Sequence, residues 1–323
     1  MPKAVIERAL VTGGAGFIGI HTVRRLVDQG RRVLVLDDLR HACGEPLPHP
    51  AELVRAELSS PEAATAILRF RPQGVIHLAA QGGVSRSVRD PAGDAQVNVV
   101  GTAAILRSAV DAGCRRVVFA SSGGAIYGRA RRLPSREGDT EQPLSPYGAA
   151  KLACEGYLGM FRRTFGLSTL ALRYSNVYGP HQDGTGEAGV VAISILRLLR
   201  GERAQVTGDG LQTRDFVYVG DVARANTAAL DAACTGALNV GTGHGTTVLE
   251  VVGTLGRLAG HPEGPERTAA RPGEVRHTHL LVERVARTLD WRAEVPLEAG
   301  LQQTLASFRE RAPHLGAAPE PGG

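Results

Sequence analysis

The chain has 323 residues and a mass of 34.0 kDa, a length that suits two domains or one large α/β domain with an appendage. Hydrophobic residues make up 43% and charged residues 21%, which supports a sizeable core and excludes disordered, collagen-like and disulfide-scaffold proteins. A net charge of +5 with only 4% aromatic residues favours a small anionic substrate over nucleic acid, because a base-stacking surface needs aromatic side chains.

Predicted strands and helices alternate through the first half of the chain. We expect strands near residues 9–12, 33–36, 75–78, 117–120 and 170–174, and helices near 18–29, 61–70, 97–112 and 147–165. Continuous apolar strands alternating with helices predict a parallel sheet covered on both faces, an α/β fold of the doubly wound class. We assign residues 1–175 to this domain.

The pattern changes after residue 176, where turns rich in Gly and Pro separate helical pieces near 189–200, 221–234, 247–259 and 298–310. We expect residues 176–311 to form a predominantly substrate-binding, mixed α/β domain, with some segments returning to the first sheet. Residues 312–323, rich in Pro, Gly and Ala, are expected to be a flexible tail.

The chain is expected to be cytoplasmic. Its four cysteines, Cys43, Cys114, Cys154 and Cys234, lie far apart and have no metal-ligand spacing, so we expect reduced thiols and no bound metal. The longest apolar run, 189–199, is interrupted by Ser194 and Arg197 and is too short to span a bilayer, so no membrane partner is expected.

A glycine-rich loop follows the first predicted strand, at residues 12–19. Glycines at positions 13, 16 and 19 allow a tight turn, a close approach to a pyrophosphate and close packing of the next helix. The second strand ends in Asp37-Asp38, where an acid binds the adenosine ribose and repels a 2′-phosphate. The pattern predicts NAD rather than NADP; Arg40 could meet a 2′-phosphate, although a solvated loop arginine is the simpler interpretation.

Tyr147 and Lys151 lie four residues apart, so a helix would place them on one face. A cation beside a phenol favours the phenolate, which would make Tyr147 a base; the alternative is a surface tyrosine and a solvated lysine. A hydroxyl from residues 119–128 would lie at the carboxyl edge of the same sheet and could relay a proton to Tyr147. His77, at a strand end, is expected to be a packed, hydrogen-bonded histidine.

These motifs resemble the extended short-chain dehydrogenase/reductase family, and within it the NAD-dependent nucleotide-sugar epimerases and dehydratases, especially the UDP-hexose 4-epimerases. The resemblance runs along nearly the whole chain, through residues 12–19, 37–39, 77–80, 98–102, 121–128, 147–151, 172–180, 214–222 and 271–274. It implies a Rossmann-type doubly wound parallel sheet with a smaller mixed α/β substrate-binding domain, bound NAD and a UDP-sugar substrate.

The resemblance also implies roles for individual residues. Tyr147 would be the base, Lys151 would bind the nicotinamide ribose, and Glu57-Leu58 would lie beside the adenine, where the family often has Asp. The implied cofactor-binding residues are Gly13, Gly16, Phe17, Ile18, Gly19, Asp37, Asp38, Leu39, Glu57, Leu58, Leu78, Ala79, Ala80, Asn98, Ser121, Tyr147, Lys151 and Tyr174.

On the substrate side, Arg214 and Arg271 would bind the diphosphate, Asn176 the diphosphate or sugar, and residues near 188–191 with Val206 the uridine. Thr278, seven residues after Arg271, would leave room beside the hexose 2-substituent, and Arg86 could meet a C6 carboxylate. The implied substrate-binding residues are Ser122, Gly123, Tyr147, Asn176, Ala188, Gly189, Val190, Val206, Arg214, Arg271, Thr278 and Arg86.

One position departs from the family pattern. The usual catalytic Ser or Thr is replaced by Gly123, so we expect Ser122 to take that role after a small shift, with Ser121 as the second candidate. Gly123-Gly124 also lacks the Asp-Glu pair with which the family's dehydratases eliminate water.

The sequence therefore predicts C4 epimerisation of a UDP-hexose or UDP-hexuronate through a 4-keto intermediate. The alternatives are a C4 reductase or uronate decarboxylase of the same fold, or a non-catalytic dinucleotide-sensing protein. We also expect a homodimer, formed through the predicted helices at 97–112 and 147–165.

Overall fold

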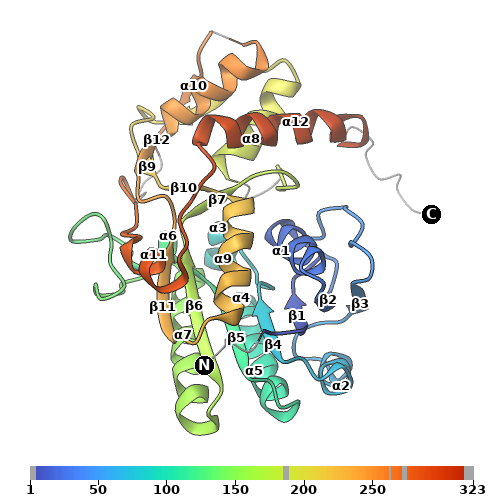
Figure 1. Ribbon diagram of the computed structural model, residues 1–323. Coiled ribbons are helices and arrows are strands. Elements are labelled where there is room, and N and C mark those ends of the chain that lie inside the picture. Colours follow the sequence, from blue (N-terminus) through green and yellow to red (C-terminus); the bar gives the residue numbers. More distant parts are fainter. Residues whose placement is uncertain (1–4, 185–188, 262, 271–274, 316–323) are drawn as a thin grey trace.

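The computed structural model describes residues 5–184, 189–261, 263–270 and 275–315. Within these residues, seven parallel strands form the central sheet in the order β11-β6-β5-β4-β1-β2-β3 (Figure 1). The strands are β1 (Arg8–Thr12), β2 (Arg32–Asp37), β3 (Glu52–Arg55), β4 (Gly74–His77), β5 (Arg116–Ser122), β6 (Ser168–Tyr174) and β11 (Gly236–Val240). The strand order reverses between β1 and β4, which is where a doubly wound sheet opens a crevice at its carboxyl edge.

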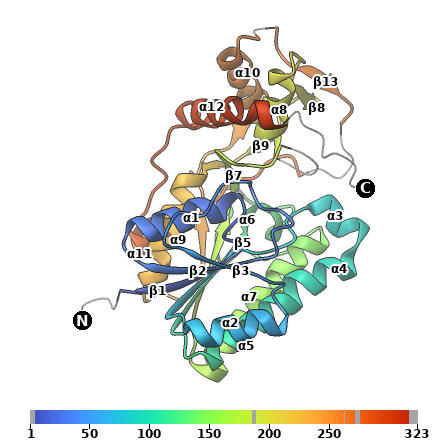
Figure 2. The same ribbon diagram turned by 90° about the vertical axis from the view of Figure 1, so that its right-hand side faces the viewer.

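Helices cover both faces of the sheet (Figure 2). On one face lie α1 (Phe17–Asp28), α9 (Val219–Asp231) and α11 (Glu283–Leu289); on the other lie α2 (Pro61–Phe70), α5 (Gly101–Asp111) and α7 (Pro146–Phe165). The strands must therefore be apolar on both sides. In β1, Val11 packs in the core beneath α1, whereas Leu10 packs in the opposite core, and both are fully buried.

Short helices connect β4 to α5 and β5 to α7. They are α3 (Val84–Arg89), α4 (Pro91–Ala95), the π-helix η1 (Gln96–Val100) and α6 (Gly123–Ile126). Helix α7 begins with Pro146, and the hydroxyl of Ser145 before it accepts a hydrogen bond from the Gly148 N–H at 3.1 Å. This cap fixes the start of the helix that carries Tyr147.

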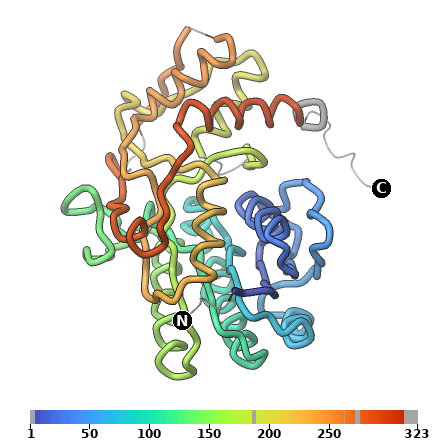
Figure 3. The backbone as a smooth tube through the Cα atoms, in the orientation of Figure 1, coloured from blue at the N-terminus to red at the C-terminus, as the bar shows by residue number. Residues whose placement is uncertain are grey.

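A second layer lies beyond the carboxyl edge of the sheet, and α8, α10 and α12 pack there around their own apolar core (Figures 1 and 2). Its elements are β7 (Asn176–Tyr178), α8 (Val190–Leu199), β8 (Gln205–Thr207), β9 (Thr213–Arg214), β10 (Phe216–Tyr218), β12 (Thr246–Thr247), α10 (Val248–Ala259), β13 (Glu266–Thr268) and α12 (Leu297–Leu315). The chain passes between the two layers repeatedly (Figure 3). After β10 it returns to the sheet to form α9 and β11.

The α/β class and doubly wound sheet predicted from the sequence are confirmed. The predicted strands and long helices are found within a few residues of their expected bounds, except that the helix expected at 97–112 begins as the π-helix η1. Twelve elements of the described residues were not predicted: the strands β3, β7, β8, β9, β10, β11, β12 and β13 and the short helices α3, α4, α6 and α11. Strand β3 is a mostly exposed edge strand and therefore lacks the apolar run that identified the others.

The structure bears on the predicted flexible tail and on the predicted domain boundary. The flexible tail was expected from residue 312, but the backbone of α12 continues to Leu315, and residues 316–323 lie outside the described part. The boundary near residue 175 stays a prediction, since β11, α9 and α11 follow it in sequence and pack on the first sheet. None of the described helices combines the length and apolarity needed to cross a membrane.

Candidate functional site

The glycine-rich loop lies where the ends of β1 and β4 meet. Gly13 has a left-handed backbone (φ +68°), and its N–H donates to the Leu36 carbonyl at 2.9 Å. A Cβ at Gly13 would come within 2.7 Å of the Ala79 nitrogen, and one at Gly19 would collide with the Gly13 carbonyl oxygen. These two glycines therefore let β1, β4 and α1 come together.

Gly16 has a different environment, because a Cβ there would meet only two backbone oxygens, at 3.3 and 3.8 Å. It is the N-cap of α1, and no side chain caps the helix. The N–H groups of the first turn, which contains Phe17 and Ile18, therefore have no capping side chain and could bind a phosphate. This arrangement fits the pyrophosphate of NAD.

The acidic pair after β2 has two separate environments. Asp37 is buried and accepts hydrogen bonds from the Ala15 N–H at 3.0 Å and the Leu39 N–H at 2.9 Å, which fixes the loop at the end of β2. Asp38 binds Arg40 at 2.6 Å. Burial would raise the pKa of Asp38, but the hydrogen bonds from Arg40 outweigh burial and hold the pKa below its ordinary value.

Arg40 also lies 3.2 Å from Glu57, so its guanidinium is held by two carboxylates. This pairing opposes the use of Arg40 for a 2′-phosphate and agrees with NAD. Leu58 packs against Gly101, where a Cβ would lie 2.9 Å from the Leu58 side chain. Leu78 and Ala80 follow β4 beside Ala79, whose N–H donates to the Thr12 carbonyl at 3.1 Å.

Lys151 is buried on α7, with 3% of its surface exposed. Its Nζ donates to the Ala120 carbonyl at 2.8 Å and lies 5.6 Å from the centre of the Tyr147 ring. Burial lowers the pKa of Lys151 to about 8, although Cys154 and the Asp94 carboxylate oppose that shift. The structure therefore brings together the two residues of the predicted pair and places a cation beside the phenol.

The hydroxyl of Tyr147 lies against Ser122. Burial raises the pKa of Tyr147 to about 12, a hydrogen bond with Ser122 lowers it, and the Asp94 carboxylate raises it further. The phenol is consequently protonated at neutral pH without the cofactor. A bound nicotinamide cation would supply the additional positive charge that favours the phenolate.

Ser121 and Ser122 differ in what their hydroxyls contact. Ser121 is buried and donates to Glu155 Oε1 at 2.6 Å, so its hydroxyl is directed to α7 rather than to the phenol of Tyr147. Ser121 therefore lacks the contact that its predicted catalytic role requires. Ser122, the last residue of β5, is the serine that lowers the pKa of Tyr147, and its catalytic role stays a prediction.

A hydrogen-bonded chain lies behind the pair. His77 Nδ1 is 2.6 Å from the Thr12 hydroxyl, and Nε2 is 2.9 Å from the Thr102 hydroxyl. Thr102 donates its proton to the Asn98 carbonyl at 2.6 Å, so it must accept from Nε2–H, and Nδ1 then accepts from Thr12. Burial, with the charge of Lys151, lowers the pKa of His77 to about 3, so His77 is the packed, neutral histidine expected.

Asn98 lies in η1 and uses its side chain to brace the loop after β4. Its Oδ1 accepts from the Gln81 N–H at 2.9 Å, and its Nδ2 donates to Asp94 at 3.0 Å. Tyr174, another predicted cofactor residue, is buried and donates to Asn226 Oδ1 on α9 at 2.5 Å. The Tyr174 phenol and the Asn98 amide thus both form hydrogen bonds within the protein. The predicted contact of each residue with NAD stays a prediction.

A narrow crevice, too tight in this structure to hold a water molecule, lies next to Ser122. Its lining residues are Gly123, Gly124, Ser175, Asn176, Asp215, Thr278, His279 and Leu280. It therefore brings together three predicted substrate residues, Gly123, Asn176 and Thr278, from three different segments. Asp215 was not assigned a role; its carboxylate accepts hydrogen bonds from the Thr242 N–H at 2.8 Å and the Leu280 N–H at 3.3 Å.

The other predicted substrate residues are not in this crevice. Arg214 lies in β9, and Gly189 is the N-cap of α8, which begins at Val190. Val206 is 1% exposed and packs in the core of the second layer, so its side chain is not available to the uridine. Arg86, on α3, lies 3.4 Å from His41. Ala188 and Arg271 lie outside the described residues.

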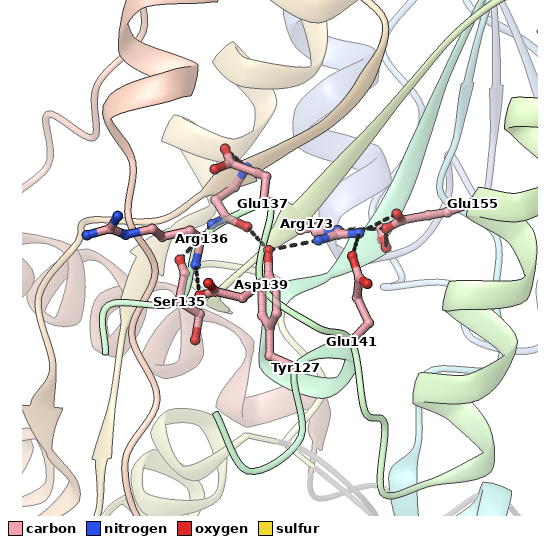
Figure 4. Close-up of polar contacts among 10 residues, drawn as sticks. Tyr127, Ser135, Arg136, Glu137, Asp139, Glu141, Glu155 and Arg173 are labelled. Atoms are coloured by element: carbon pink, nitrogen blue, oxygen red, sulfur yellow. Dashed lines mark hydrogen bonds and ion pairs between the residues drawn. The ribbon is translucent and has the colours of Figure 1, made fainter. Parts of the chain in front are cut away.

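A buried ionic network, which the sequence analysis did not predict, supports the strand that carries Ser122 (Figure 4). Arg173 of β6 is 3% exposed and donates to Glu155, Glu141 and the Tyr127 hydroxyl at 2.7, 2.8 and 2.9 Å. Glu155 also accepts from Ser121, so the network joins β5, β6 and α7. Its members are far apart in sequence, and no local pattern identifies them.

Within the described residues no group of three or more His, Cys, Asp or Glu side chains could hold a metal ion.

Comparisons with known proteins find relatives that are similar along nearly the whole chain. The UDP-glucose 4-epimerase of Mycolicibacterium smegmatis is 42% identical over 311 residues, covering 94% of this chain and 99% of that protein.

Two solved structures are similar over their whole length. A UDP-glucose 4-epimerase from Thermotoga maritima with UDP-glucose superposes with a TM-score of 0.91 at 42% identity, covering 94% of this chain and 99% of that one. A Thermus thermophilus UDP-glucose 4-epimerase in complex with NAD gives 0.87 at 41% identity, with coverage of 96% and 100%. The profile of the NAD dependent epimerase/dehydratase family matches residues 9–241, and the chain belongs to that family.

Proposed function

We propose that this protein catalyses the NAD-dependent C4 epimerisation of a UDP-hexose. The observation that carries the proposal is the meeting of Tyr147, Ser122 and Lys151 at the carboxyl edge of the sheet, next to a glycine-rich loop that fits NAD. The high similarity to UDP-glucose 4-epimerases supports the same reaction. No observation on this chain favours the reductase, decarboxylase or sensing alternatives.

In this mechanism the Tyr147 phenolate takes the proton of the sugar 4-hydroxyl, and Ser122 holds that hydroxyl and relays the proton. Bound NAD accepts the hydride from C4 and later returns it. The sugar becomes a 4-ketose between the two transfers, and rotation about its link to the diphosphate presents the opposite face. Tyr147 then returns the proton to O4, so the enzyme ends in its starting state.

The remaining side chains orient these groups. Lys151 keeps a positive charge beside Tyr147 and would bind the nicotinamide ribose. Asn176 is exposed at the crevice and would contact the sugar or diphosphate, whereas Arg214 would bind the diphosphate. The hexuronate substrate and the cytoplasmic location expected from the sequence stay predictions.

The first test is Tyr147→Phe, which removes the phenol and keeps the ring. We expect C4 epimerisation of UDP-glucose to fall by about 10²–10⁴-fold, with the fold intact. Tyr157→Phe is the matched control, because Tyr157 is 40% exposed on the same helix, away from the base. Near-normal turnover in Tyr147→Phe would exclude Tyr147 as the base.

The second test concerns Lys151. Its pKa is about 8 in the folded protein and 10.5 when unfolded, so the cost of burying the charge is fully present below pH 8 and disappears as the pH rises towards 10.5. We expect Lys151→Met to raise the free energy of unfolding of NAD-free protein at pH 7 by up to about 3 kcal/mol. The gain should shrink above pH 8, while NAD binding weakens. Denaturant unfolding of the NAD-free protein at several pH values measures the stability gain, and titration with NAD measures the binding; an equal gain at every pH would contradict the assignment.

The third test concerns the size of the sugar pocket. Thr278 is small and lines the crevice, so we expect measurable epimerisation of UDP-N-acetylglucosamine. Thr278→Tyr should suppress turnover of the N-acetylated substrate and spare UDP-glucose, whereas Thr278→Ser should retain both. Equal loss of both activities in Thr278→Tyr, or no N-acetyl activity in the parent protein, would show that Thr278 is not the gate.

We also propose a homodimer in which α5 and α7 pack against their copies. The exposed surface near these helices includes Val100, Tyr157 and Phe165, which are 45%, 40% and 43% exposed. Apolar side chains of this size favour burial against a partner. Light scattering should give twice 34 kDa at micromolar concentration, and Tyr157→Glu should shift the protein towards the monomer. A monomer in the parent protein would exclude this assembly.

A further inference from the structure

The space beside Gly123 is already filled by a side chain from a distant segment. A Cβ at Gly123 would come within 2.6 and 2.9 Å of the two methyl carbons of Leu280, and within 3.2 Å of the Arg173 carbonyl oxygen. Leu280 is 2% exposed. Any residue other than glycine at position 123 must therefore shift the methyl groups of Leu280.

The neighbouring positions are arranged differently. A Cβ at Gly124 would meet nothing closer than Asn176 Oδ1 at 3.9 Å and Ser122 Oγ at 4.0 Å. The Ser122 hydroxyl thus lies beside open space and close enough to the Tyr147 phenol to lower its pKa. Position 122 therefore carries a hydroxyl beside open space. A side chain at position 123 would instead meet the methyl groups of Leu280.

Leu280 is held firmly from both sides. Its N–H donates to the buried carboxylate of Asp215 at 3.3 Å. Ser135 bonds the residues on either side of it: the Ser135 N–H donates to the His279 carbonyl at 3.0 Å, and the Leu281 N–H donates to the Ser135 carbonyl at 2.8 Å.

The hydrogen bonds around Ser135 continue to Arg173 of β6. The Ser135 carbonyl accepts from Asn239 Nδ2 at 2.9 Å, and Asn239 Oδ1 accepts from the Tyr127 hydroxyl at 2.7 Å. Tyr127 in turn accepts from Arg173 (Figure 4). The backbone of the segment that carries Leu280 is thereby fixed relative to β6.

We propose that Leu280 is a positioning residue for the epimerase reaction: by filling the space beside Gly123, it holds the end of β5 so that the hydroxyl of Ser122, rather than of residue 123, meets Tyr147. The proposal rests on the proposed function. Leu280 acts through Ser122 and needs no contact with the substrate.

Relocating the hydroxyl tests this directly. Ser122→Ala should lower kcat by roughly 10²-fold or more. Adding Gly123→Ser alone should restore nothing, because Leu280 occupies the space. Adding Gly123→Ser together with Leu280→Ala should raise kcat at least about tenfold above Ser122→Ala, with KM little changed. A triple variant no more active than Ser122→Ala, or rescue by Gly123→Ser without Leu280→Ala, would overturn the proposal.

A second measurement separates this proposal from the proposed function, since it needs no turnover. The ultraviolet absorbance of the Tyr147 phenolate is titrated in the NAD-bound protein, with Tyr147→Phe as the blank. Ser122→Ala and Leu280→Ala should both move the midpoint to higher pH, because each weakens the hydrogen bond to the phenolate. The control Leu255→Ala, in the core of the second layer, should leave it unchanged. An unmoved midpoint in Leu280→Ala beside a clear shift in Ser122→Ala would exclude the positioning role.

Discussion

A positive charge kept out of water is the constraint on which this site depends. Lys151 is buried on α7, and its Nζ bonds the Ala120 carbonyl at the end of β5. A second cation nearby would repel it, and His77 is kept neutral by burial and by two threonine hydroxyls that determine which ring nitrogen carries the proton. The carboxyl edge of the sheet therefore places the Lys151 cation beside the Tyr147 phenol, and the surrounding hydrogen bonds maintain that arrangement.

Arg173 is a second buried cation, and it is stabilised in a different way from Lys151. Its charge is also buried, but Glu155 and Glu141 lie within hydrogen-bond distance, so the guanidinium is fully paired. Breaking a buried pair leaves an unpaired charge, which costs several kcal/mol, so the residues around Arg173 have little freedom to move independently. The network joins β5 to the segment that carries Leu280, through Tyr127, Asn239 and Ser135.

The local parts of this site could be predicted from the sequence. Glycine spacing, an acid at a strand end and a Tyr-Lys pair at helical spacing each depend on residues close in sequence, and the structure places them as the spacing implies. The contact between Gly123 and Leu280 joins residues more than 150 positions apart and could not be predicted. The burial of Val206 depends on the packing of the second layer, and the π-helix η1 has no periodic signal that distinguishes it from the α-helix expected there.

In the proposed function, the segment that carries Thr278 also supports the end of β5, which carries Ser122. Thr278 and Leu280 lie two residues apart in one extended segment, and both line the crevice. Thr213 bonds this segment on one side, where its carbonyl accepts from the Thr278 N–H at 3.1 Å, and Ser135 bonds it on the other. A bulky sugar cannot push the segment outward without disturbing the support of Ser122. If the pocket accepts a larger 2-substituent, as proposed, the room must therefore come from the small side chain of Thr278 and the open space beside Gly124.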